Sequence, residues 1–195
     1  MIKQRTIPGI TRKTPQGGRG RDLELVLERT HKVYAFRKIG SIDKHEREWR
    51  YCGLVEYQKL RITAPAIAAM ASNGRPLKAI KSIVDFSGVA RGMSTYFDAK
   101  ETQGKSLPLA NISEHQTRFL FEKQACGAWA GFLIYFSDLN RFFFLKASYV
   151  RDVTTEALVK KGRKSISLAM CEENGTEIFE DKDGVLDWAS ALFSE

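Results

Sequence analysis

An apolar run of nine residues, Ala128 to Phe136, lies in the second half of the chain and leaves few possible folds. Its aromatic and branched side chains favour an extended strand, and an uninterrupted apolar run indicates burial on both faces. The sequence Asp138-Leu139-Asn140 then predicts a turn, and Arg141 to Lys146 predicts the neighbouring strand. A strand covered on both faces needs further layers above and below it. We therefore expect an α/β or α+β domain.

Composition narrows the class of protein further. The 195 residues suffice for one domain, and 43% hydrophobic with 28% charged residues is typical of globular proteins. No apolar stretch approaches the roughly 20 residues of a membrane span, so we expect no membrane contact. Cys52, Cys126 and Cys171 lack the C-x-x-C spacing of zinc sites. The N-terminus has no secretory h-region, which predicts a cytoplasmic location.

Basic charge is unevenly distributed along the chain. Lys and Arg number 31 against 23 Asp and Glu, a net charge of +8, which makes a polyanionic partner worth testing. Residues 1–21 carry six basic residues and no acid, together with prolines and glycines, and indicate a flexible basic arm before a single domain over 22–195. A second acid-free stretch, Tyr57 to Val84, is basic and alanine-rich. It predicts an excursion from the core at about 57–80.

Periodicity and turn signals place the remaining elements. We expect helices over about 22–35, 113–126, 154–161 and from about 183, and strands over about 54–62, 80–86, 93–102 and 165–171. The strands over 80–86 and 93–102 would form a hairpin through the glycine-containing segment 87–92. This order predicts a mixed sheet covered by helices.

The strongest candidate for chemistry lies on that hairpin. Side chains alternate along a strand, so Asp98 and Lys100 project from one face. If the turn centres on Arg91 and Gly92, Asp85 lies opposite Asp98, with Cβ atoms about 4.5 to 5.5 Å apart. Two such carboxylates are stabilised by a shared proton or a divalent cation, and a hard cation with oxygen ligands fits best. A lysine beside a metal suits phosphoryl chemistry.

Each of these residues also has a purely structural interpretation. Asp85 could end a strand while Asp98 and Lys100 form a surface ion pair, and spacing alone does not decide. Gln116 follows Ser113 in the capping-box pattern S-x-x-Q, which favours a helix cap over a site role. Glu24 could point from the first helix into the site or be an exposed helical acid.

Several short motifs occur along the chain in a definite order. They are Gly18-Arg19-Gly20 with Leu23-Glu24, Val84 to Val89, Tyr96 to Thr102, Pro108 to Ile112 with Glu114-His115-Gln116, Gly127 before the apolar strand, and Gly162 to Ile166. Together they resemble the RecU family of Holliday-junction resolvases, of the PD-(D/E)xK nuclease superfamily. The resemblance spans residues 17 to about 170.

This resemblance implies a restriction-endonuclease-like fold with a protruding stalk, which the excursion at 57–80 matches. It implies a homodimer that resolves four-way DNA junctions by paired metal-dependent cuts in recombination and repair, with Mg²⁺ or alternatively Mn²⁺ as cofactor and recombination proteins as further partners. Asp85 and Asp98 would bind the metal, Lys100 would be catalytic, and Gln116 would be a further metal-site residue, which reverses the capping interpretation. Glu24 would support the site.

Two residues depart from the family pattern. Asp98 stands where the family commonly has glutamate, and Ile83 stands where it has threonine, two residues before the first aspartate. The shorter carboxylate shifts a bound cation by about a methylene, and Ile83 can offer a cation only its backbone carbonyl.

Basic residues of the arm, the stalk and the 162–166 motif are expected to contact DNA phosphates. These are Arg19, Arg21, Lys59, Arg61, Arg75, Lys78, Lys81, Arg163 and Lys164. Such contacts make affinity fall with salt and position the DNA without reading its sequence. Two rival interpretations stay open: a nuclease of the same fold that acts on other branched or duplex DNA, and a branched-DNA-binding protein without catalysis.

Overall fold

A computed structural model describes residues 21–45, 48–51, 77–80, 83–160 and 162–193 of the chain. Contacts divide the chain into two compact units, Met1–Lys44 with Val84–Glu195 and His45–Ile83. In the second unit, β2 (Glu48–Tyr51) pairs antiparallel with β3 (Leu77–Ile80). The predicted arm, apart from its last residue, the strand expected over 54–62 and most of the predicted stalk lie outside the described residues.

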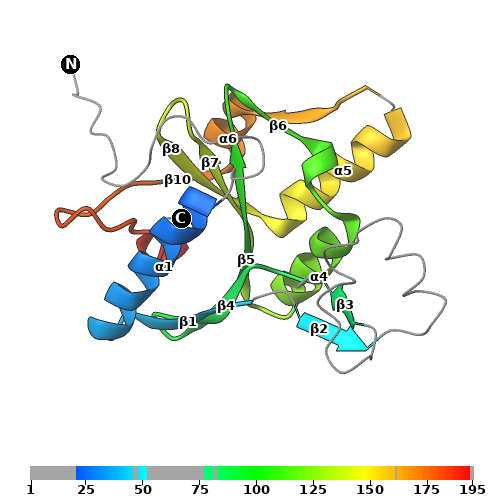
Figure 1. Ribbon diagram of the computed structural model, residues 1–195. Helices are drawn as coiled ribbons and strands as arrows, with labels where there is room; N and C mark the ends of the chain where they lie inside the picture. Colours follow the sequence, from blue (N-terminus) through cyan, green and yellow to red (C-terminus); the bar gives the residue numbers. More distant parts are fainter. Residues whose placement is uncertain (1–20, 46–47, 52–76, 81–82, 161, 194–195) are drawn as a thin grey trace, which may run out of the picture. The chain divides into compact units, whose positions relative to one another are not determined.

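The first unit is built on one six-stranded sheet (Figure 1). In spatial order the strands are β1 (Gly40–Lys44), β4 (Phe86–Ala90), β5 (Met93–Thr102), β7 (Trp129–Phe136), β8 (Arg141–Lys146) and β10 (Thr176–Ile178). β5 and β7 run parallel, and every other neighbouring pair is antiparallel. The predicted mixed α+β sheet is therefore confirmed.

Helices and a second, smaller sheet complete this unit. They are α1 (Arg21–Phe36), the 3-10 helix η2 (Leu109–Asn111), α4 (Glu114–Ala125), α5 (Ala147–Lys160), α6 (Leu168–Asn174) and the 3-10 helix η3 (Ser190–Phe193), while β6 (Ser106–Pro108) pairs with β9 (Ser165–Ser167). α4 belongs to the crossover that the parallel β5 and β7 require. Within the described ranges, no helix is long and apolar enough to cross a membrane.

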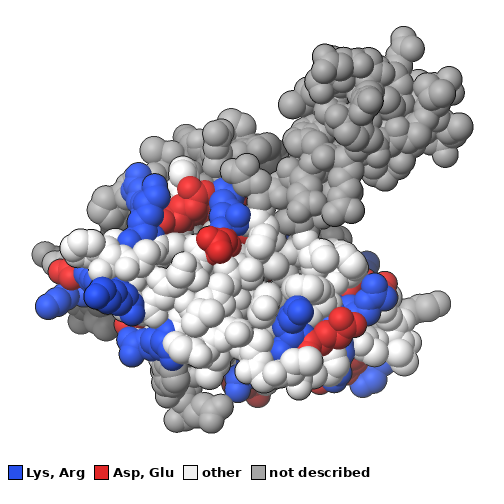
Figure 2. Space-filling model, turned by 90° about the horizontal axis from the view of Figure 1, so that it is seen from below, with Lys and Arg blue, Asp and Glu red and all other residues white. Residues whose placement is uncertain are grey.

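The charge on the face shown in Figure 2 is mixed. Lysine, arginine and acidic side chains lie next to one another toward the margin, and the middle consists of other residues. The net positive charge of the sequence therefore does not appear on this face as a broad field of one sign.

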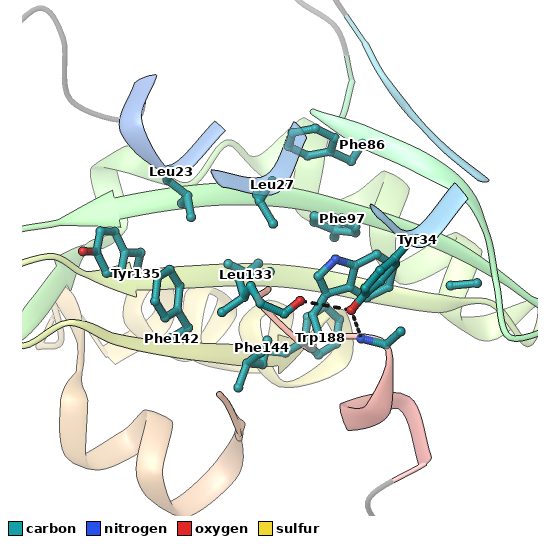
Figure 3. Close-up of a cluster of buried hydrophobic side chains, with 14 of the residues drawn as sticks. Leu23, Leu27, Tyr34, Phe86, Phe97, Leu133, Tyr135, Phe142, Phe144 and Trp188 are labelled. Atoms are coloured by element: carbon teal, nitrogen blue, oxygen red, sulfur yellow. Dashed lines mark hydrogen bonds between the residues drawn. The ribbon is translucent and has the colours of Figure 1, made fainter. Parts of the chain in front are cut away.

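One face of the sheet is covered by α1 and an aromatic cluster (Figure 3). Leu23, Leu27 and Tyr34 are fully buried, and their spacing of three to four residues per turn puts them on one helix face. The Tyr34 hydroxyl donates to the Leu186 carbonyl at 3.0 Å and accepts from the Ala189 N–H at 3.0 Å. These bonds anchor the C-terminal segment to α1.

The other face is covered by α4 and α5. Phe132, Ile134 and Phe136 of β7 pack there with Leu120 of α4 and Val150 of α5. All eight residues of β7 are buried. The prediction of a strand buried on both faces is confirmed.

Four of the predicted elements are misplaced. The helix expected from Asp183 is a turn, in which the Asp181 carboxylate accepts from the Asp183 and Val185 N–H groups at 2.9 and 3.0 Å and Gly184 has φ +74°. The strand expected over 165–171 ends at Ser167, whose hydroxyl accepts from the Met170 N–H and caps α6. The helix expected over 154–161 already begins at Ala147. The strand expected over 80–86 is wrong, since β4 begins only at Phe86.

Candidate active site

The β4–β5 hairpin brings the two predicted aspartates together. Its turn consists of Arg91 and Gly92, with φ 47° and 80°, and two residues with positive φ match the twist of a tight hairpin. The ladder runs from Ala90 opposite Met93 to Phe86 opposite Phe97. The next position places Asp85 beside Asp98, as the turn centred on Arg91 and Gly92 predicts.

Asp98 and Lys100 form a buried ion pair on one face of β5. The Asp98 side chain is completely buried, the Lys100 side chain is 17% exposed, and Lys100 Nζ lies 2.5 Å from Asp98 Oδ2. Because the carboxylate has no access to water, the interpretation of this contact as a surface ion pair is wrong. A buried charge of this kind requires close partners.

Gln116 joins this pair from α4. Ser113 occupies the N-cap position, yet its side chain makes no capping hydrogen bond. The Gln116 Nε2 instead donates to Asp98 Oδ1 at 2.6 Å, and Lys100 Nζ donates to Gln116 Oε1 at 3.4 Å. The capping-box interpretation is therefore wrong, and the amide connects both members of the ion pair.

Asp85 lies at the entrance to β4. Its Oδ2 accepts a hydrogen bond from the Ala99 N–H at 2.9 Å. Burial raises the pKa of Asp85, whereas the Ala99 N–H and the Lys100 charge oppose that rise. The negative charge of Glu24 on α1 raises the pKa further. Glu24 itself is paired with Lys44 Nζ at 2.8 Å, and the sequence alone did not single out Lys44.

Burial and the charge of Asp85 raise the pKa of Asp98 to about 7, although Lys100 acts in the opposite direction. Asp98 Oδ2 is buried without an aligned hydrogen bond, despite the nearby ammonium. Two carboxylates at one spot are costly unless a proton or a cation neutralises them. A further positive charge, from a proton or a cation, would therefore stabilise the two carboxylates.

The donor set fits a hard divalent cation. Asp85 and Asp98 offer carboxylate oxygens and Gln116 offers an amide oxygen, which are ligands of the type that Mg²⁺ prefers. Three or more His, Cys, Asp or Glu side chains do not gather into a metal-binding group anywhere in the described chain. Since Mg²⁺ commonly keeps several waters and takes one or two carboxylates, two acids are sufficient.

The predicted DNA contacts are only partly described. Arg163 and Lys164 are exposed in the loop before β9, and the Leu109 N–H donates to the Lys164 carbonyl at 2.9 Å. Both line a cavity of about 690 Å³ between α4 and α5 that also includes Arg118 and Arg151. For Arg21 on α1 and Lys78 on β3 only the backbone is described. Arg19, Lys59, Arg61, Arg75 and Lys81 lie outside the described residues.

A mixed sheet that holds the buried Asp98 and the partly buried Asp85 beside a lysine and an amide has the side chains that phosphate-ester hydrolysis with a bound cation would use. The family model of recombination protein U, RecU, matches residues 18–193. The chain therefore belongs to the RecU family.

Relatives from several bacteria carry the same family name. The chain is 32% identical over 163 residues to the Holliday junction resolvase RecU of Pediococcus pentosaceus, covering 83% of this chain and 76% of that protein. It is 30% identical over 187 residues to the protein of that name from Lactococcus lactis subsp. cremoris MG1363, covering 90% and 82%. The protein of that name from Staphylococcus saprophyticus is 29% identical over 175 residues, covering 88% and 78%.

Proposed function

We propose that this chain is a structure-selective endonuclease that resolves four-way Holliday junctions in DNA recombination and repair. Relatives that the chain matches over most of their length are named Holliday junction resolvases. The single observation that carries the proposal is the buried Asp98, held by Lys100 and Gln116 next to Asp85. An arrangement of this kind costs folding free energy, which favours a catalytic role over a structural one.

The proposed active form is a homodimer of a restriction-endonuclease-like fold. A two-fold axis would give two identical sites, and a four-way junction requires two cuts placed symmetrically. The acid pair at the end of the β4–β5 hairpin, with the parallel β7 beside it, supports this fold. Recombination proteins of the host are the proposed further partners.

The proposed cofactor is Mg²⁺, with Mn²⁺ as an alternative, held by Asp85, Asp98 and Gln116. When bound, the cation neutralises charge on the phosphate and increases the acidity of water. Asp98 is one methylene shorter than the glutamate common in the family, and the amide of Gln116 holds its carboxylate in place. Turning that amide over would present Oε1 to the cation in place of Nε2.

Lys100 has two roles in this proposal. Its ammonium balances the buried charge of Asp98 before DNA binds. When a phosphodiester enters, the ammonium can donate a hydrogen bond to a phosphate oxygen or orient the attacking water. The Ala99 N–H holds Asp85 at a defined position, so both carboxylates are positioned before the substrate arrives.

The test compares labelled four-way junction, flap and linear duplex of the same arm sequences, in Mg²⁺, in Mn²⁺ and in EDTA. We expect cleavage of the junction only with a metal, and a loss of at least a thousandfold, about 4 kcal/mol in the barrier, for Asp85→Asn. Asp152→Asn is the matched control, because Asp152 is an exposed acid on α5 paired with Arg151. Equal cutting of linear duplex would show a nuclease of another specificity.

Two further outcomes decide between the remaining alternatives. Binding of the junction without cleavage in either metal would favour a non-catalytic DNA-binding protein. A supercoiled plasmid with an extruded cruciform tests the dimer, since paired cuts in one encounter convert it directly to linear DNA. Accumulation of nicked circles, with a monomer mass by light scattering, would contradict the homodimer.

A further inference from the structure

Further side chains lie on the same surface as the candidate active site, in the direction of the β4–β5 turn. Tyr96 lies two residues before Asp98 on β5, and so projects from the same face of the strand. Phe119 and Lys123 follow Gln116 at three and seven residues on α4, and therefore lie on the same side of that helix. Strand and helix together extend the site in one direction.

Lys123 differs from the other lysines of this region. Its ammonium lies 5.3 Å from the centre of the Tyr96 ring and 5.1 Å from that of Phe119, and the two rings meet edge to face at 6.1 Å. Lys44 and Lys100 are paired with carboxylates, whereas no described acid lies within ion-pair distance of Lys123. The two rings fix the position of the ammonium and leave its charge uncompensated.

A second cavity opens beside this lysine. Its volume is about 500 Å³, and Ser94, Tyr96, Lys123 and Gly127 are among the residues that line it. The cavity lies at the C-terminal end of α4, where free backbone carbonyls disfavour anions. Here, however, the carbonyls of Glu122, Lys123 and Gln124 accept hydrogen bonds from the N–H groups that follow them. These carbonyls are therefore engaged within the helix end, and the ammonium is free to bind an anion.

The spacing suits a DNA strand that passes through the active site. Lys123 follows Gln116 by seven residues, roughly 10 Å along an α-helix. One strand of duplex DNA rises about 3.4 Å per nucleotide. The ammonium is thus within about three nucleotides of the position where the scissile phosphate would lie, because the axial rise sets the largest number of nucleotides that fit in this length.

We propose that Lys123 binds a backbone phosphate of the cleaved strand, within about three nucleotides of the cut. The inference rests on the proposed nuclease function and names a substrate contact that the chain provides next to its catalytic residues. Tyr96 and Phe119 are positioning residues for this lysine. The contact orients the strand, so it contributes to substrate binding and leaves the chemical step unchanged.

The first experiment measures junction affinity and its dependence on salt. It uses the full chain with Asp85→Asn as a background that prevents cleavage. Lys123→Gln should weaken binding about five- to tenfold and reduce the slope of log K against log salt by just under one, the value for one phosphate contact. Lys123→Arg should restore most of both effects. Lys182→Gln, a change at an exposed lysine in the acidic C-terminal segment, is the control and should change neither.

The second experiment locates the contact. Neutral methylphosphonates are placed singly at each of the five linkages on either side of the cut. At one linkage, the methylphosphonate should weaken binding by the protein with Lys123 several-fold. The same methylphosphonate should weaken binding by Lys123→Gln less than twofold, because the neutral linkage and the substitution remove the same interaction. Equal losses for both proteins at every linkage, or an unchanged salt slope, would overturn the proposal.

The two proposals fail separately in these measurements. Cleavage by the unmodified chain with no effect of Lys123→Gln refutes the phosphate contact and leaves the nuclease. Absence of cleavage by the unmodified chain refutes the nuclease, and the binding measurements then still decide whether Lys123 contacts a phosphate.

Discussion

The two faces of β5 differ in chemistry although they belong to the same ten residues. On the face toward α1, Phe97 is completely buried in the aromatic cluster, at ring distances of 5.2 Å from both Phe86 and Trp188. On the face toward α4, Asp98 is equally buried but has an ionisable carboxyl group, which contacts the Lys100 ammonium. Neighbouring residues of one strand thus serve opposite purposes.

This difference shows how the fold can hold a costly site. Apolar burial under α1 stabilises the strand by roughly 2 to 3 kcal/mol for each large side chain. That free energy offsets the desolvation of Asp98 on the other face. Changes on the first face should therefore reduce stability, and changes on the second should reduce activity while stability is kept or increased.

The largest effect is expected on the α1 face. Phe97→Ala removes a buried aromatic ring between Phe86 and Trp188, and should reduce the free energy of unfolding by about 3 to 5 kcal/mol. Urea unfolding followed by tryptophan fluorescence measures this loss. Exposed Phe36→Ala is the control and should cost little. Equal effects of both changes would show that the cluster does not carry the stability of this face.

On the opposite face, Asp98→Asn should change how stability depends on pH. The pKa of Asp98 is raised to about 7 in the folded chain, so the native state holds a proton that the unfolded chain loses near pH 4. Stability from this group is present at low pH and is lost as pH rises toward 8, by roughly 4 kcal/mol. The variant should lack this decline in metal-free unfolding between pH 4 and 8. A decline as steep as in the unmodified chain would contradict the assignment.

His31 gives the opposite sign on the α1 face. Burial lowers its pKa to about 3, among the rings of Phe86, Phe97 and Trp188. The unfolded chain binds the proton near pH 6.5 and the native state does not, so stability is present at neutral pH and is lost on acidification. His31→Leu should reduce the loss between pH 7 and 4 by roughly 3 kcal/mol. A variant as acid-sensitive as the unmodified chain would show that another group is responsible.

The smallest effect is expected at Gln116. Gln116→Ala removes the hydrogen bond to Asp98 and should slow junction cleavage about 10- to 100-fold, as is usual for residues that orient a metal ligand. Stability should change little, and a shift of the Mg²⁺ dependence to higher concentration separates this role from a general defect. The control is Gln124→Ala on the same helix, whose side chain binds Ser148. Equal loss in both variants would indicate that α4 itself had moved.

Much of the architecture was predictable because its signals are local. The apolar run before Phe136 could only be a buried strand, and Arg91-Gly92 formed the expected turn. Alternation along a strand is a property of the backbone, so Asp98 and Lys100 had to share a face. The short polar strand β1 was missed, since a partly exposed edge strand such as Gly40–Lys44 lacks both an apolar run and alternation.

The wrong predictions near the C-terminus arise from hydrogen bonds between side chains and backbone. The turn after Asp181 depends on its carboxylate binding two backbone N–H groups, and the end of β9 depends on the hydroxyl of Ser167. Such side-chain bonds compete with regular structure over one or two residues. Composition averaged over a window does not register them.

Local patterns were enough to predict the mixed sheet, the buried strand and, given a turn at Arg91-Gly92, the approach of Asp85 to Asp98 and Lys100, because backbone alternation and a two-residue turn leave few alternatives. Three contacts become visible only in the folded chain. Gln116 binds Asp98 and does not cap its helix, Glu24 pairs with Lys44, and Lys123 lies over two aromatic rings. The reason is that these contacts join elements separated in sequence. Their geometry depends on how the helices pack on the sheet, and no local sequence pattern encodes that packing.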